Sequence, residues 1–106
     1  MRVEQILSDE IKESKRWIDK AEGVNKRDLV KRIELINWVL DNMKNSNVPI
    51  CELMESKMNE TVLKINKTYT IEEADILHSE LRILDWIFYQ VCNDQQKRLS
   101  TNQGYQ

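Results

Sequence analysis

A long apolar run extends from Ile71 to Gln96 and is densest in Leu81-Arg82-Ile83-Leu84-Asp85-Trp86-Ile87-Phe88-Tyr89. Within it, apolar residues recur at alternating steps of three and four positions, a spacing that predicts an amphipathic helix. At about 100° per residue, six of them fall on one face that covers roughly a third of the circumference. This predicted inner stripe comprises Ala74, Leu77, Leu81, Leu84, Phe88 and Val91.

The beginning of this helix carries a clear signal. Thr70 and Glu73 have the spacing of a capping box, in which the threonine hydroxyl accepts a hydrogen bond from a free backbone N–H group of the first turn. Toward its other end the stretch becomes polar, and Thr101-Asn102-Gln103-Gly104 interrupts the run of helix-favouring residues. We therefore expect the helix to begin after Thr70 and to stop between Val91 and Ser100.

A second apolar face remains on this helix after the inner stripe is assigned. Trp86 and Tyr89 lie on the side away from that stripe. Arg82 lies beside them, and Ile83 lies on the flank between the two faces. Trp and Tyr are favoured anchors in protein interfaces, although half-exposed aromatic side chains are also ordinary on helix surfaces. We interpret this second face as a contact with another chain.

The second predicted helix carries a weak echo of the fourth. A shift of 48 residues places Leu35-Ile36-Asn37-Trp38-Val39 over Ile83-Leu84-Asp85-Trp86-Ile87, so both helices carry an outward tryptophan at equivalent points. A duplicated helical hairpin would explain this echo, and so would the general similarity of amphipathic helices. The predicted interface consists of Trp86, Tyr89, Ile83 and Arg82, with Trp38 and Leu35 contributing from the second helix.

The composition favours helix nearly throughout the chain. The 106 residues are 41% apolar and 32% charged, with only two glycines and one proline to interrupt helices. This length predicts one helical domain, which we place at residues 1–99, followed by a flexible tail at residues 100–106. The formal net charge of −2 is too near zero for its sign to indicate a partner.

Three further helices are predicted before the long run, at residues 2–22, 26–44 and 49–66. Gly23 is predicted to end the first helix in a left-handed conformation, and Pro49 suits the first turn of the third. Because the turns are short, consecutive helices should run antiparallel. The predicted fold is all-α, an up-down-up-down four-helix bundle or two helical hairpins.

The two cysteines are expected to be free thiols. A hairpin of the third and fourth helices about Thr68 places Cys51 at the level of Asp85. Cys92 lies about two turns further along, so a disulfide is not predicted. No apolar run is typical of a signal peptide, and no stretch approaches the ~20 apolar residues of a membrane span. We therefore expect a cytoplasmic protein with reduced thiols and no membrane contact.

Few side chains offer metal or nucleophile chemistry. His78 is the sole histidine and lies near the margin of the inner stripe, where a hydrogen-bonded structural role is the better interpretation. Neither cysteine has a second cysteine or histidine at ligand spacing, and neither has a credible acid–base partner. We therefore predict no metal and no cofactor.

Two acidic pairs form the better candidate for catalysis, Glu52-x-x-Glu55 and Glu72-x-x-Asp75. This spacing resembles the acidic pairs by which the all-α nucleoside-triphosphate pyrophosphohydrolases of the MazG kind hold Mg²⁺. The resemblance, which covers these four positions, implies magnesium-dependent nucleotide hydrolysis. That family usually has a further glutamate just before the first pair, where this chain has Cys51. An antiparallel hairpin would also place the two pairs toward opposite ends, so we expect no enzyme.

A DNA-binding alternative is a helix-turn-helix unit between residues 28 and 67. The recognition helix would run from Asn59 to Lys67, and its phosphate and base contacts would come from Lys57, Asn59, Lys64 and Lys67. Nothing between Ser56 and Glu60 compels a turn, however, and the recognition helix would lack arginine. Nucleic acid is therefore not the favoured partner.

The sequence as a whole favours a small non-enzymatic helical bundle that binds protein through its aromatic helix face. Its expected partner is a second copy of the chain in a homodimer, or another protein for which it serves as adaptor or regulator. A helix-turn-helix DNA-binding regulator is the first alternative. A MazG-like pyrophosphohydrolase is the second.

Overall fold

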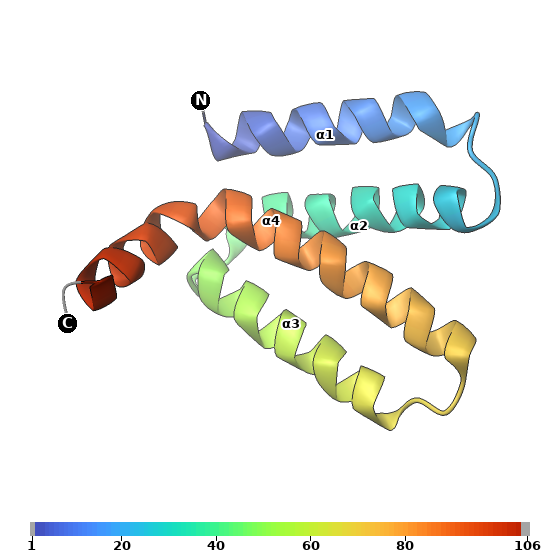
Figure 1. Ribbon diagram of the computed structural model, residues 1–106. Coiled ribbons are helices and arrows are strands. Elements are labelled where there is room, and N and C mark those ends of the chain that lie inside the picture. The colour runs from blue at the N-terminus through green and yellow to red at the C-terminus, as the bar shows by residue number, and fades with distance from the viewer. Residues whose placement is uncertain (1, 105–106) are drawn as a thin grey trace.

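The computed structural model describes the backbone of residues 2–104 and the side chains of residues 2–92. Within these ranges the chain forms four helices joined by short linkers, and it contains no strand (Figure 1). The helices are α1 (Val3–Ile18), α2 (Gly23–Asn45), α3 (Ile50–Lys67) and α4 (Ile71–Gly104).

Consecutive helices run antiparallel, so the predicted all-α four-helix bundle is confirmed. The most extensive helix contacts are those of α1 with α2 and of α3 with α4. Figure 1 shows the second of these hairpins inclined to the first, with α4 between α3 and the α1–α2 pair. The fold therefore consists of two helical hairpins, and one helix of each, α2 and α4, contacts all three others.

The breaks between helices follow the residues that favour them. Gly23 has φ +58°, the left-handed conformation expected for it, but α1 already ends at Ile18 and Gly23 begins α2. The second helix therefore begins earlier than the predicted position 26. Pro49 is the N-cap residue of α3, where its missing N–H group costs no helical hydrogen bond.

The predicted cap at the start of α4 is confirmed. Thr70 Oγ1 accepts a hydrogen bond from the backbone N–H of Glu73 at 3.1 Å. The Glu73 carboxylate in turn accepts a hydrogen bond from Thr68 Oγ1 at 2.6 Å. These two bonds fix the linker between α3 and α4 as well as the first turn of α4.

The core lies where α4 meets α2 and α3. Ile36, Met54 and Leu84 are fully buried, and they come from α2, α3 and α4 respectively. Side chains from both hairpins meet there, and the close packing of a protein core makes each buried methylene matter. In the described part of the chain the core cluster consists of Leu7, Leu35, Ile36, Val39, Met54, Ile83, Leu84 and Ile87.

Both apolar faces of α4 have neighbouring helices within the chain. Leu77 and Leu81 border hollows shared with α3, and Ser79 borders a cleft shared with α2. Ile76 lies between them and borders both. A helix with neighbours on two sides needs an apolar face on each of them. Packing within one chain therefore explains the second apolar face at Trp86, which packs against the core, whereas Tyr89 remains exposed.

The predicted free thiols are wrong, because Cys51 and Cys92 form a disulfide with a Cα–Cα distance of 6.0 Å. At ~1.5 Å per residue, α3 runs about 24 Å from Cys51 to Lys67, and α4 runs about 31 Å from Ile71 to Cys92. The linker accounts for the difference. Thr68 is extended, and an extended linker carries the chain beyond the end of α3 before α4 begins.

α4 continues to Gly104, past the predicted end before Ser100. Ser, Thr and Asn are weaker helix formers, but Gly104 is the first strong breaker after Pro49, so nothing compels an earlier stop. Of the predicted tail at residues 100–106, residues 105–106 lie outside the described part. Among the described residues, no helix combines the length and apolar character needed to cross a membrane.

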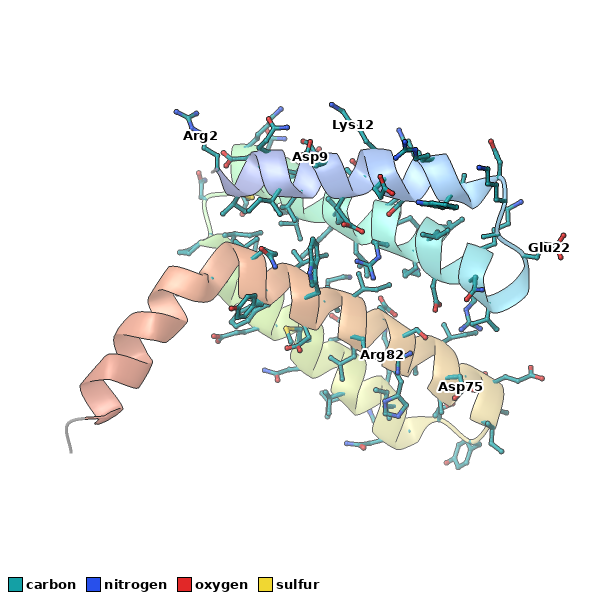
Figure 2. All side chains as sticks on the ribbon, turned by 45° about the horizontal axis from the view of Figure 1, so that its top comes forward. Arg2, Asp9, Lys12, Glu22, Asp75 and Arg82 are labelled. Carbon is teal, nitrogen blue, oxygen red and sulfur yellow. A yellow bond between two sulfur atoms is a disulfide. The ribbon has the colours of Figure 1, made fainter. Side chains whose placement is uncertain are left out.

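α1 is attached to the bundle by a narrow face. Arg2, Lys12 and Glu22, in and beside this helix, point away from the bundle (Figure 2). Among the described residues, Leu7 and Ser14 are the buried side chains of α1. Ser14 Oγ is buried without a hydrogen-bond partner in the described part of the chain.

Replacing Ser14 with alanine is expected to stabilise the protein by about 1 kcal/mol, because a buried hydroxyl without a partner loses its hydration on folding. The midpoint of urea unfolding should rise accordingly. Ser56, which is exposed on α3, provides the matched control. Ser56→Ala should change the free energy of unfolding only by a few tenths of a kcal/mol through helix propensity. A lower midpoint for Ser14→Ala would show that the hydroxyl has a stabilising partner.

Candidate functional site

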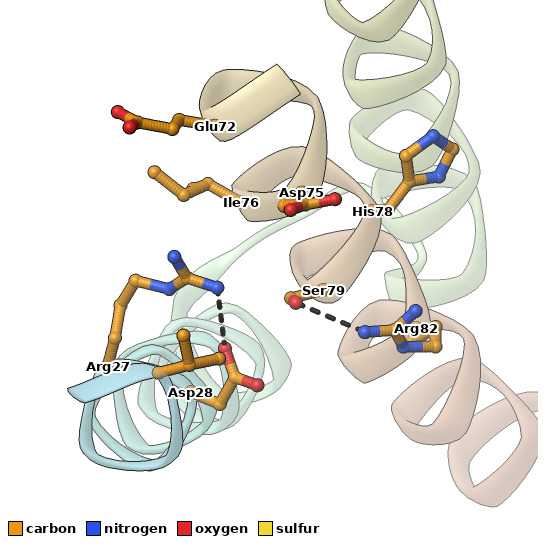
Figure 3. Close-up of a pocket in the computed structure, with 9 residues that line it drawn as sticks. Arg27, Asp28, Glu72, Asp75, Ile76, His78, Ser79 and Arg82 are labelled. Atoms are coloured by element: carbon orange, nitrogen blue, oxygen red, sulfur yellow. Dashed lines mark hydrogen bonds and ion pairs between the residues drawn. The ribbon is translucent and has the colours of Figure 1, made fainter. Parts of the chain in front are cut away.

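A polar cleft of about 380 Å³ lies between the two hairpins, where the start of α2 faces the start of α4 (Figure 3). Both of its arginines are hydrogen-bonded to near neighbours in the sequence. Arg27 Nη2 donates to Asp28 Oδ1 at 3.5 Å, and Arg82 Nη2 donates to Ser79 Oγ at 3.2 Å. The cleft is lined by Val24, Arg27, Asp28, Glu72, Asp75, Ile76, His78, Ser79 and Arg82.

The side chains from α4 diverge around this cleft. Figure 3 shows Glu72 and Ile76 on one side of α4, toward Arg27, and His78 and Arg82 on the other side. Catalysis by an acid and a base needs both groups within hydrogen-bond reach of one reacting centre. The cleft brings no such group of residues together.

The two acidic pairs that resemble a magnesium site lie far apart along the hairpin. Glu72 and Asp75 are in the first turns of α4, close to the linker, whereas Glu52 and Glu55 are in the first turns of α3, at the opposite end. Among the described residues, no group of three or more His, Cys, Asp or Glu side chains is placed to hold a metal ion. The four carboxylates are therefore not brought into one site.

The three-helix arrangement of the helix-turn-helix alternative is not formed. α3 is one continuous helix from Ile50 to Lys67, with no turn between Ser56 and Glu60. Lys64 Nζ forms an ion pair with Glu60 Oε1 at 3.6 Å, and Lys57 lies over a tryptophan of α2. Two of the four proposed contact residues are therefore engaged within the chain.

Trp86 was predicted to face another chain, but it is partly buried against the core of its own. The guanidinium of Arg32, on α2, lies 5.6 Å from the centroid of its ring. Arg32 Nη1 also pairs with Glu10 Oε2 of α1 at 3.3 Å. A cation over an aromatic ring is attracted by the ring quadrupole, so this contact connects α4 to α2, and the ion pair extends the connection to α1.

Trp38 has an equivalent arrangement on α2. It is partly buried against the core, and Lys57 Nζ of α3 lies 4.9 Å from its ring centroid. Both tryptophans that the internal echo places at equivalent points are thus covered by a basic side chain from a neighbouring helix. Their outward faces serve contacts within the chain.

Trp17 of α1 follows the same pattern at the surface. Lys20 Nζ lies 5.2 Å from its ring centroid, and Trp17 Nε1 donates a hydrogen bond to Glu13 Oε1 at 2.7 Å. That hydrogen bond, with help from the nearby Arg16, lowers the pKa of the Glu13 carboxyl below its usual value. Each of the three tryptophans therefore has a cation of its own chain beside it.

Two residues of the predicted interface are core residues. Ile83 is 4% exposed and Leu35 is 5% exposed, and both belong to the buried cluster. Other side chains of the same chain cover both of them, so they are not part of the surface that the structure exposes. Ile83 lies on the same side of α4 as Ser79, which borders the cleft shared with α2, and Trp86, which lies against Arg32 of α2.

Arg82 and Tyr89 remain on the surface from the predicted set. They are seven residues apart, so they share one face of α4, and exposed Asp85 lies on the same face. A groove of about 380 Å³ lies between α3 and α4, next to Arg82 and Asp85. It is lined by Met58, Asn59, Val62, Leu81, Arg82 and Asp85. We call this groove, together with Tyr89, the outer face of the α3–α4 hairpin.

Comparisons with known proteins do not assign this site. No protein-family model, curated protein or solved structure matches the chain. What the outer face can do is therefore argued from its own side chains.

The sequence contained one signal for the outer face. The stripe of α3 is thin and rich in methionine, and it includes Met58 and Val62, so it covers α4 incompletely. Val62 is 40% exposed and Leu81 is only partly buried, although both stand at inward positions of their helices. The signal was missed because the periodicity assigns a side chain to a face but does not show how fully the neighbouring helix covers that face.

Proposed function

We propose that the protein is a non-enzymatic helical bundle that binds a second copy of itself through the outer face of the α3–α4 hairpin. The observation that carries this proposal is the groove in which apolar side chains from two helices lie beside an arginine and an aspartate on its rim. A homodimer formed in this way would be the unit that serves as an adaptor or regulator.

The character of the groove favours a protein over a small molecule. Met58, Val62 and Leu81 form an apolar floor that is open along the hairpin, whereas sites for small ligands are usually concave and enclose most of the ligand surface. Methionine is also common at surfaces that adapt to another protein. A helix of a partner could rest along this floor.

The charges on the rim favour a second copy in particular. Arg82 and Asp85 are one turn apart on α4, and in the described part of the chain neither forms an ion pair. Under twofold symmetry the same patch faces itself, so Arg82 of one copy can pair with Asp85 of the other, and the reverse. A patch with both signs one turn apart is therefore complementary to itself.

Tyr89 extends this contact along α4. It is 56% exposed, which leaves most of an aromatic ring available for a partner. Buried apolar area contributes about 25 cal/mol per Å², and a stable interface covers roughly 800 Å² on each partner. The groove alone offers less surface than a stable interface buries, so the dimer contact must extend over the whole outer face, including Tyr89.

The test is the mass of the protein in solution, measured by sedimentation equilibrium or light scattering over a range of concentrations. Wild type is expected to have twice the mass of one chain. Asp85→Arg should shift the protein to single chains, because two arginines would then face each other across the twofold axis. The swap Arg82→Asp with Asp85→Arg should restore the dimer, since it reverses both charges together.

Two further variants complete the design. Val62→Glu places a charge on the apolar floor and should also give single chains. Asp41→Arg makes the same charge reversal as Asp85→Arg at an exposed position of α2, outside the outer face, and should leave the dimer intact. A wild-type protein with the mass of one chain at every concentration would refute the homodimer and leave the outer face to another protein.

A further inference from the structure

The disulfide between Cys51 and Cys92 closes the α3–α4 hairpin at the end opposite its linker. Residues 68–70 join the two helices at one end, and the two sulfur atoms join them at the other. We propose that this disulfide is a redox-controlled clasp: thiols of the glutathione class open it, and opening releases the first turns of α3 from α4. This inference does not depend on the homodimer.

The two cysteine residues differ in access to solvent. Cys92 is only 2% exposed, whereas Cys51 is partly exposed in the first turn of α3. Exchange with a small thiol should therefore proceed at Cys51, with Cys92 as the resolving group.

The exchange balances without any other reactant. To open the clasp, a glutathione thiolate attacks Cys51 Sγ, the bond to Cys92 Sγ breaks, and Cys92 leaves as a thiolate that takes up a proton. A second glutathione thiolate then attacks the glutathione sulfur of the mixed disulfide. It releases Cys51 as a thiol and forms oxidised glutathione. The protein disulfide is reduced by two electrons, and two glutathione molecules are oxidised.

The structure indicates what opening changes. Met54 lies three residues after Cys51 and is fully buried in the core cluster. The segment before α3, residues 46–49, is not helical, so the first turns of α3 can move without bending α2. Without the bond, the chain must hold these turns against α4 by packing alone. The ring of about 41 residues no longer restricts the open states, and their population rises.

The state of such a disulfide depends on the redox conditions of the compartment that holds the protein. Glutathione keeps most thiols reduced in the cytoplasm, whereas disulfides persist in oxidising compartments. A disulfide that opens in a reducing compartment and closes in an oxidising one would give the same chain a different conformation in each. A purely structural disulfide would instead resist the glutathione pool.

The first measurement compares two single variants treated with oxidised glutathione and analysed by mass spectrometry. Cys92→Ser should form the mixed disulfide at Cys51 at least ~10-fold faster than Cys51→Ser forms it at Cys92, because only Cys51 is accessible in the folded protein. Equal rates would refute the assignment of Cys51 as the exchanging residue.

The second measurement is amide hydrogen exchange of wild type in oxidised and in reduced glutathione. The amides of residues 52–56 should exchange about 100-fold faster in the reduced protein, and reoxidation should restore their protection. The double variant Cys51→Ser with Cys92→Ser should match the reduced protein. Because the wild-type disulfide can be reduced and reoxidised, the comparison of its two states tests the proposal even if the double variant does not fold. Unchanged exchange on reduction, or two free thiols after treatment with oxidised glutathione, would overturn the proposal.

Discussion

Replacing Ile83 with glutamate is expected to leave the chain largely unfolded. Ile83 is in the core cluster on the side of α4 that faces α2. Loss of a buried isoleucine side chain costs about 2–5 kcal/mol, and burial of a carboxylate without a partner adds several more. A domain of this size has only about 5–15 kcal/mol of stability in total. Helical circular dichroism should therefore be strongly reduced at 25 °C.

Ile71 offers a matched control on the same helix. It is 82% exposed in the first turn of α4, where a glutamate is also favoured by the helix dipole. Ile71→Glu should leave the helical signal and the midpoint of urea unfolding nearly unchanged. If Ile83→Glu also kept its helical signal, Ile83 would be free on the surface, and its original assignment to an interface would return.

The number and type of helices could be predicted from the sequence because these depend on local signals. Period-3.6 spacing of apolar residues predicts where helix forms, and Pro49 predicts where it is interrupted. The hydroxyl of Thr70 acts within one turn, so the cap of α4 also followed from the sequence. Antiparallel packing followed in turn, because short linkers leave few other arrangements.

The surroundings of α4 could not be predicted in the same way. A helix that carries apolar residues on two sides must have neighbours on both, but the pattern does not tell whether a neighbour belongs to the same chain. The decisive contact is Arg32 over Trp86, which joins residues more than fifty positions apart. Such long-range contacts depend on how hairpins pack, and periodicity carries no information about that.

The cysteine pairing shows a second limit. Which residues face each other in a hairpin depends on the length that the linker spans, not only on the number of its residues. Thr68 is extended, and each extended residue advances the chain by more than twice the rise of a helical residue. This shift moves the partner of Cys51 from Asp85 to Cys92. A sequence argument that counts residues symmetrically about the turn misses it.

The second large effect concerns the attachment of α1. Leu7→Ala is expected to lower the free energy of unfolding by about 3 kcal/mol, because Leu7 is fully buried and its removal leaves a cavity. α1 also contacts the bundle through the partly buried Val3 and Ile11. In addition, Glu10 forms an ion pair with Arg32, in which both side chains are 30% exposed. Pairs with that degree of exposure contribute only about 0–1 kcal/mol.

Because the expected loss at Leu7 is larger than the contribution of the ion pair, we expect Leu7 to be the main anchor of α1. Leu63→Ala removes the same atoms from a leucine that is mostly exposed on α3, so it should change the free energy of unfolding by less than about 0.5 kcal/mol. Urea unfolding of both variants provides the measurement. In Leu7→Ala, the amides of α1 should also exchange faster than those of α4, because α1 then separates from the bundle before the core unfolds. If Leu7→Ala lowered the free energy of unfolding no more than Leu63→Ala does, α1 would be held chiefly by its partly buried residues.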